Sequence, residues 1–150
     1  NVYDDVPGQK PELDVRLFEL QISIKTITGD LGGIKASWSG DEKKTDEFIE
    51  TYAPSCDIIL VQIPDFKAGR NDGCFFLIPL SVQEEILDAL GNNDYLKKLP
   101  AGTNNRGIEF DREAMQRMTT HAETRCIVIP WAEDIDLEFD PVTEWIVRWS

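Results

Sequence analysis

Hydrophobic and polar residues alternate strictly in one stretch of this sequence, Asp14-Val15-Arg16-Leu17-Phe18-Glu19-Leu20-Gln21-Ile22-Ser23-Ile24-Lys25-Thr26. From Phe18 to Lys25, apolar residues hold the even positions and polar residues hold the odd ones. Successive side chains of a β-strand point to opposite faces, so the pattern predicts a strand with one apolar face. From Asp14 to Ile27, the stretch is either one continuous strand or a tight bend followed by a strand.

The polar face of this strand carries a carboxylate, an amide, a hydroxyl and an ammonium group: Glu19, Gln21, Ser23 and Lys25. Asp14, just upstream, adds a second carboxylate. Carboxylates beside a lysine can hold a divalent cation and activate a water molecule. We therefore predict metal-dependent phosphodiester hydrolysis, with Asp14 and Glu19 as candidate metal ligands. The alternative interpretation is an ordinary amphipathic strand with a solvated outer face.

The composition of the whole chain is that of a globular protein. It has 150 residues, 41% of them hydrophobic and 29% charged, which fits a single domain with a sizeable core. No apolar run approaches the roughly 20 residues needed to cross a bilayer. The three cysteines form no CxxC pair, which favours reduced thiols and a cytoplasmic protein. Because the first residue is Asn1 rather than methionine, we expect a fragment that lacks its N-terminal part.

The charge of the chain is strongly acidic, with a formal net charge of −13. This is an objection to nucleic-acid binding, because phosphates are contacted by lysine, arginine and backbone amides. The charge favours an alternative from another functional class, an acidic, non-catalytic α/β interaction domain that inhibits a basic partner. A bound metal ion would neutralise active-site carboxylates, so the objection does not exclude a nuclease.

The remaining sequence predicts helices and strands in the order of an α/β domain. We expect helices at Asp41–Tyr52, Val82–Leu90 and Asp111–His121, and strands at Cys56–Ile63, Cys74–Leu80, Thr124–Ile129 and Glu144–Trp149. The segments 28–40 and 92–105 are expected to be loops. A polar-faced strand, a helix and an apolar strand in succession predict a βαβ unit in a mixed central sheet flanked by helices. Six apolar residues should be buried in neighbouring strands of that sheet: Ile58, Leu60, Phe76, Ile78, Ile127 and Ile129.

With this order of elements, the chain resembles the PD-(D/E)xK superfamily of nucleases, which have the type II restriction endonuclease-like fold. The residues that carry the resemblance are Pro11-Glu12-Leu13-Asp14 and Ser23-Ile24-Lys25, followed by a helix and a buried strand. The resemblance implies that Asp14 is the first acid of the motif and that Lys25 is its lysine. Ser23 then stands at the position of the second acid, where this sequence departs from the common pattern.

A serine cannot supply a charged metal ligand, so the resemblance requires a carboxylate from elsewhere. Glu19 shares the polar strand face, and Glu42 and Glu47 lie on the helix that follows. A second register is also open, because Glu19-Leu20-Gln21 resembles the Glu-x-Gln variant of the same motif.

The activity implied by the resemblance is that of a Mg²⁺-dependent endodeoxyribonuclease of restriction type, which acts on double-stranded DNA. A homodimer would match a palindromic site through its two-fold symmetry. Asp14 and a second carboxylate would hold Mg²⁺, and Lys25 would position or deprotonate the attacking water. Gln21 and Ser23 would orient water or ligands by hydrogen bonding. A degenerate nuclease fold kept only for DNA binding is a third possibility.

Two polar loops are candidate DNA contacts. One contains Asn104, Asn105 and Arg106, and the other contains Lys67 and Arg70. Side-chain amides and guanidinium groups suit contacts to base edges and phosphates. A structured turn and a plain surface hairpin are the alternative interpretations of these loops.

Overall fold

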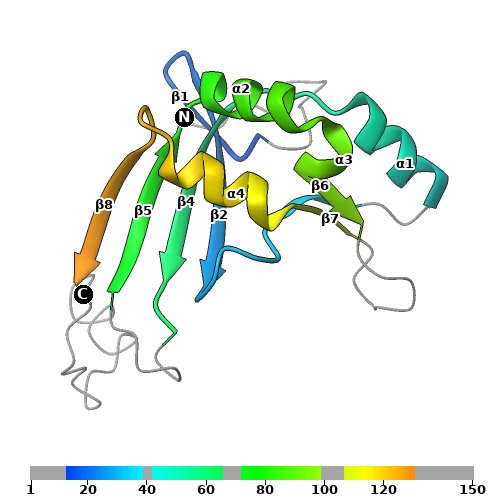
Figure 1. Cartoon of the computed structure of the whole chain (residues 1–150). Helices are drawn as coiled ribbons and strands as arrows, with labels where there is room; N and C mark the ends of the chain where they lie inside the picture. The colour runs from blue at the N-terminus through cyan, green and yellow to red at the C-terminus, as the bar shows by residue number, and fades with distance from the viewer. Residues whose placement is uncertain (1–12, 39–41, 66–71, 99–106, 131–150) are drawn as a thin grey trace, which may run out of the picture.

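Two β-sheets and four helices make up the part of the protein that the structure, a computed structural model, describes: residues 13–38, 42–65, 72–98 and 107–130. The larger sheet has five strands in the order β1 (Val15–Leu17), β2 (Leu20–Thr28), β4 (Asp57–Ile63), β5 (Asp72–Ile78) and β8 (Arg125–Pro130). The smaller sheet has three strands in the order β3 (Lys35–Trp38), β7 (Gly107–Phe110) and β6 (Leu96–Lys98). The helices are α1 (Glu42–Thr51), α2 (Leu80–Leu90), α3 (Asn92–Tyr95) and α4 (Arg112–Thr120). Figure 1 shows α4 crossing one face of the larger sheet.

The strands β2 and β4 are parallel neighbours, in register from Ile22 opposite Asp57 to Thr28 opposite Ile63. The chain passes between them through β3 and α1, which confirms the predicted βαβ unit. The other neighbouring strands of the larger sheet pair antiparallel, so the sheet is mixed. The predicted α/β fold, a mixed central sheet with helices, is therefore confirmed.

The first two strands form a β-hairpin with its turn at Phe18 and Glu19. The φ angle of Phe18 is +56°, in the left-handed region that non-glycine residues rarely adopt, and its side chain is 88% exposed. The strand therefore starts at Leu20, and the prediction that Phe18 and Glu19 belong to it is wrong. The alternative of a tight bend within the stretch is confirmed.

The core lies on the side of the larger sheet that faces α2 and α4. Its sheet residues pack with apolar residues of the two helices: Ile58, Leu60, Phe76 and Ile78 with Val82, Ile86, Met115 and Met118. The burial predicted for those four sheet residues is confirmed. It is wrong for Ile127, which is 68% exposed, and Ile129 is only partly buried. Ile127 pairs with Phe75 on the opposite face of the edge strand β8, where no helix of the described part packs.

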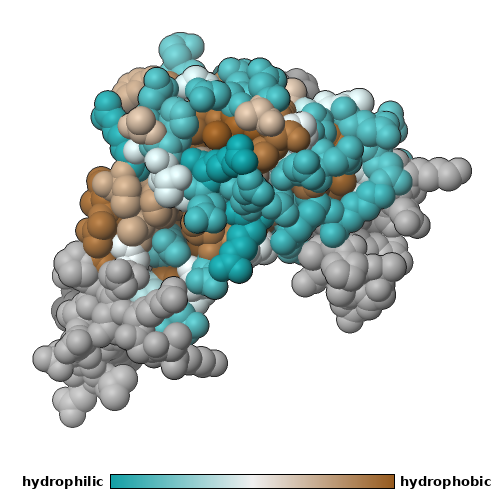
Figure 2. All heavy atoms as spheres, in the orientation of Figure 1, coloured by the Kyte–Doolittle hydropathy of each residue, from teal (hydrophilic) through white to brown (hydrophobic). Residues whose placement is uncertain are grey.

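That opposite face of the larger sheet is also apolar. The strand registers align Ile24 with Ile59 and Leu77 in one row, and Val61 with Phe75 and Ile127 in the next. Each of these side chains is at least partly exposed. Figure 2 shows the hydrophobic surface along β8 at the edge of the sheet.

The smaller sheet was not predicted: β3 and β6 fall in the segments 28–40 and 92–105, which were expected to be loops, and no strand was predicted at β7. Its strands have three or four residues each, too few for a pattern of alternation to stand out. Its apolar face joins the core through four buried residues: Ala36, Leu96, Ile108 and Phe110. Tyr95 stacks on Tyr52, with ring centroids 5.8 Å apart, and contacts Phe110 edge-to-face, with ring centroids 5.7 Å apart.

Helix ends follow the predictions closely, with one correction. α4 is capped by Asp111, whose carboxylate accepts a hydrogen bond of 2.8 Å from the backbone N–H of Glu113. α2 begins at Leu80, two residues before the predicted start at Val82, and its N-cap residue Pro79 makes no side-chain capping hydrogen bond. The Leu80 N–H instead donates to the Asp57 carboxylate at 2.8 Å, which ties α2 to the start of β4. No helix in the described ranges is long and apolar enough to cross a membrane.

Replacing Leu60 by alanine should lower the free energy of unfolding by about 2–5 kcal/mol, because the side chain is fully buried and its loss leaves a cavity. The matched control is Ile127→Ala, which removes a similar side chain from an exposed position. We expect a change within about 0.5 kcal/mol for the control. Urea unfolding followed by circular dichroism measures both. Equal losses in the two variants would contradict the burial described above.

Candidate active site

Asp14 is held against β2 by its own carboxylate. Its Oδ2 atom accepts a hydrogen bond of 2.6 Å from the backbone N–H of Ile24 and one of 3.1 Å from the Ser23 hydroxyl. Asp14 directly precedes β1, next to the last residue pair of the hairpin, Val15 and Ile22. Its carboxylate therefore accepts the hydrogen bond of a β2 backbone N–H beyond that pair. Among the described residues, none donates to Oδ1, which leaves that oxygen available to a ligand.

Gln21, Ser23 and Lys25 lie on one face of β2, and the hairpin sets which residue of the preceding segment lies opposite each of them. Arg16 pairs with Gln21, so the preceding row brings Asp14 to Ser23, as their hydrogen bond confirms. Lys25 follows one row further along β2. Alternate residues of a strand are roughly 7 Å apart, which puts Lys25 next to the Asp14–Ser23 pair. The structure thus brings Asp14, Ser23 and Lys25 to one surface, as their spacing predicts.

This surface opens from the edge of the core toward solvent. Ser23 is only 1% exposed, and it aligns with the buried Ile58 of β4. Lys25 aligns with Leu60 but remains partly exposed, whereas Asp14 is exposed. A ligand could therefore reach Asp14 and Lys25, while the buried Ser23 donates its hydrogen bond to Asp14.

Glu19 is not part of this surface. It lies in the hairpin turn, beyond the Leu17–Leu20 pair, and is exposed. Gln21 lies between the turn and Ser23, partly exposed. Glu47 is exposed on α1. The predicted DNA contacts lie outside the described residues: Lys67, Arg70, Asn104, Asn105 and Arg106.

Arg16 belongs to this surface and was missed in the sequence analysis. Its place in the alternating stretch, two residues after Asp14, was a signal that could have found it.

The oxygen atoms of this surface, which include the single carboxylate of Asp14, are of the kind that a hard divalent cation binds. Within the described ranges there is no group of three or more histidine, cysteine, aspartate or glutamate residues that could hold a metal. The surface does offer the Oδ1 atom of Asp14, and Gln21 follows the Asp14–Ser23 pair on the same face of the hairpin. Mg²⁺ prefers oxygen ligands, keeps several waters and is commonly bound by one or two carboxylates together with substrate phosphates.

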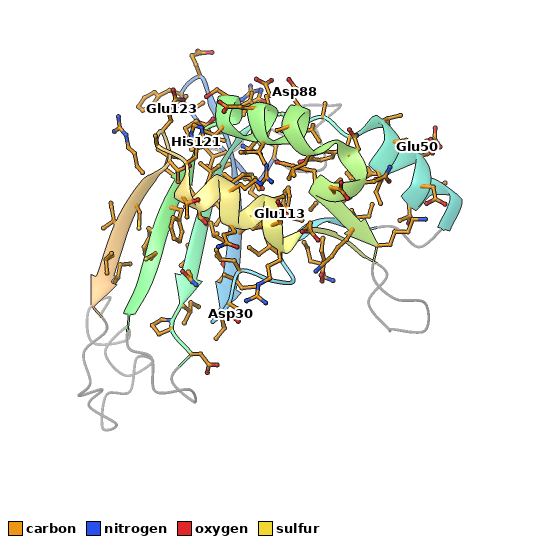
Figure 3. All side chains as sticks on the ribbon, in the orientation of Figure 1. Asp30, Glu50, Asp88, Glu113, His121 and Glu123 are labelled. Atoms are coloured by element: carbon orange, nitrogen blue, oxygen red, sulfur yellow. The ribbon has the colours of Figure 1, made fainter. Side chains whose placement is uncertain are left out.

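Several other charged groups of the described residues form ion pairs with each other. Arg112, at the start of α4, contacts Asp30 after the end of β2 at 3.0 Å; Figure 3 labels Asp30. The nearly buried Glu109 lies between Lys35 at 2.8 Å and Lys97 at 3.8 Å, across the three strands of the smaller sheet. These pairs join α4 to the segment after β2, and the three strands of the smaller sheet to one another.

A mixed sheet with a parallel β2–β4 pair, and an aspartate before β1 on the same face of the hairpin as a lysine of β2, are typical of the restriction endonuclease-like class. Comparison with known proteins agrees with this. The family model described as restriction endonuclease ThaI matches residues 1–150, so the chain belongs to this family. The resemblance to PD-(D/E)xK nucleases is thereby confirmed.

A solved structure described as a restriction endonuclease in complex with substrate DNA is also similar. It matches with a TM-score of 0.79 and 38% sequence identity, over 97% of this chain and 68% of that chain. No curated protein matches. Membership of a restriction endonuclease family implies that a divalent metal ion is the cofactor.

Replacing Asp14 by alanine should lower the free energy of unfolding by about 1 kcal/mol, since the Ile24 N–H and the Ser23 hydroxyl lose their acceptor. The Ile24 amide should also exchange faster with deuterium. Asp14→Asn keeps one oxygen acceptor and should lose less stability. Asp88→Ala is the control, because Asp88 is exposed on α2 (Figure 3). An Ile24 amide that exchanges equally fast in Asp14→Ala and wild type would contradict this anchoring role.

Proposed function

We propose that the Asp14–Lys25 surface is the active site of a Mg²⁺-dependent endodeoxyribonuclease that hydrolyses phosphodiester bonds in double-stranded DNA. The observation that carries the proposal is the hydrogen-bonded Asp14–Ser23 pair with Lys25 one row away on the same strand face. Two comparisons with known proteins support the proposal: the match to the restriction endonuclease family, and the similarity to a solved restriction endonuclease described with substrate DNA.

Asp14 would hold the metal through Oδ1, while Oδ2 stays bound to the Ile24 N–H and the Ser23 hydroxyl. A bound Mg²⁺ ion would supply positive charge to the scissile phosphate and favour ionisation of a bound water. Lys25 would position or deprotonate the attacking water and offset the negative charge that develops on the phosphate. Gln21, next along the same face, would orient water or substrate by hydrogen bonding.

Ser23 then replaces the second acid of the motif with a hydroxyl that donates to the first acid. This arrangement keeps the Asp14 carboxylate in one position and leaves its other oxygen for the metal. It favours the Ser23-Ile24-Lys25 register, because Glu19 lies in the hairpin turn and not beside Asp14. The remaining metal ligands would come from water and the DNA phosphate.

The protein would act as a homodimer on a palindromic site in the cytoplasm. Two-fold symmetry of the enzyme would match two-fold symmetry of the site, with one active site for each strand. We propose that base and phosphate contacts come from the segments 66–71 and 99–106, which lie between β4 and β5 and between β6 and β7 in the sequence. An acidic inhibitor of a basic protein accounts for the net charge, but not for membership of a restriction endonuclease family.

Replacing Lys25 by alanine should lower the rate of DNA cleavage by about 10²–10³-fold, because the site loses a preorganised positive group. Single-turnover cleavage of plasmid DNA with Mg²⁺, using the full-length protein, measures the rate, and addition of EDTA should abolish cleavage. Lys44→Ala is the control, since Lys44 is exposed on α1. Unchanged cleavage by a folded Lys25→Ala variant would refute the mechanism.

The two possible registers of the motif make opposite predictions. We expect Ser23→Ala to slow cleavage by about 10-fold or more, because Asp14 loses a hydrogen bond that fixes it. Glu19→Ala should change the rate by less than about two-fold, because the side chain lies in the turn. The same single-turnover assay compares the two variants. A larger loss for Glu19→Ala would assign the second acidic position to Glu19 and overturn the register proposed here.

A further inference from the structure

Arg16 lies in the middle of β1, two residues after Asp14 and opposite Gln21 of β2. Alternation along the strand places it on the same face as Asp14. Its side chain is exposed, and in the described ranges no carboxylate lies within ion-pair distance of it. It is therefore an unneutralised cation beside the proposed active site.

The position of Arg16 relative to Lys25 is specific. The hairpin arranges three successive rows on this face: Arg16 with Gln21, then Asp14 with Ser23, then Lys25. The two cations thus flank the acid along the strand direction, one on each side. The neighbouring residues of β4 on this face, Ile58 and Leu60, are apolar and add no charge.

Most other described cations are neutralised within the protein. Ion pairs to carboxylates involve five of them: Lys35, Lys97, Lys98, Arg112 and Arg117. A chain with a net charge of −13 repels DNA at long range, so an unpaired cation beside the reaction site has a large local effect. A guanidinium group is suited to this task, because it can donate two parallel hydrogen bonds to one phosphate.

We propose that Arg16 binds a backbone phosphate of the DNA strand being cut, next to the scissile phosphate, and so holds the strand along the hairpin between Arg16 and Lys25. This inference rests on the proposed nuclease function of the same surface. Arg16 acts here in substrate binding, and Lys25 acts in the chemical step. The two residues are therefore separable by experiment.

The test compares Arg16→Ala with Arg125→Ala, which removes the same charge from an exposed strand residue in β8, at the opposite edge of the larger sheet. DNA binding is measured by fluorescence anisotropy with a labelled duplex in metal-free buffer, over a range of salt concentrations. We expect Arg16→Ala to raise the Kd about 10-fold and to lower the salt slope by about one. Arg125→Ala should have little effect on either, and Arg16→Lys should restore part of the affinity. Single-turnover cleavage at saturating DNA should fall much less in Arg16→Ala than in Lys25→Ala.

The outcomes separate this inference from the proposed function. Equal losses of affinity in Arg16→Ala and Arg125→Ala would show a general effect of net charge and overturn the inference. An unchanged Kd in Arg16→Ala, together with lost cleavage in Lys25→Ala, would overturn the inference alone. Failure of the wild-type protein both to bind and to cleave DNA would overturn the inference and the proposed function together.

Discussion

The parallel pairing of β2 with β4 is the constraint on which the rest of the structure depends. Because the register is fixed from Ile22 to Thr28, Ser23 and Lys25 align with the core residues Ile58 and Leu60. A shift by one residue would turn the polar side chains to the opposite face of the sheet. The same strand also carries the hairpin to β1, which brings Asp14 to Ser23. The core and the candidate site are thus positioned by one strand.

The sequence was sufficient to predict the central part of the larger sheet. The apolar runs of β4 and β5 are long, and their buried residues Leu60 and Ile78 follow from continuous β-prone sequence. It was insufficient at the edge strand β8. Ile127 is an isoleucine within an apolar run, like the core residues, but it faces away from the helices. The smaller sheet could not be predicted, because short strands are stabilised by contacts with distant elements rather than by local pattern.

The candidate site was predictable to the extent that it depends on alternation. The grouping of Asp14, Ser23 and Lys25 follows from their spacing once a hairpin is allowed. The exclusion of Glu19 could not be read from the pattern, because Phe18, a bulky residue, adopts a positive φ angle that sequence rules assign to glycine. The place of Arg16 was visible in the alternation, but its significance depends on which other cations are paired, and that is a property of the folded chain.

The hydrogen bonds of Asp14 have a consequence for how this enzyme can lose its activity in evolution. The carboxylate proposed to hold the metal also accepts a hydrogen bond from the Ile24 N–H at the end of the hairpin, so one side chain would serve both folding and chemistry. Lys25 has no such structural contact among the described residues. A population under pressure to silence the enzyme could therefore keep an intact, inert protein by changing Lys25. Changes at Asp14 would yield less stable copies that cellular proteases remove more readily.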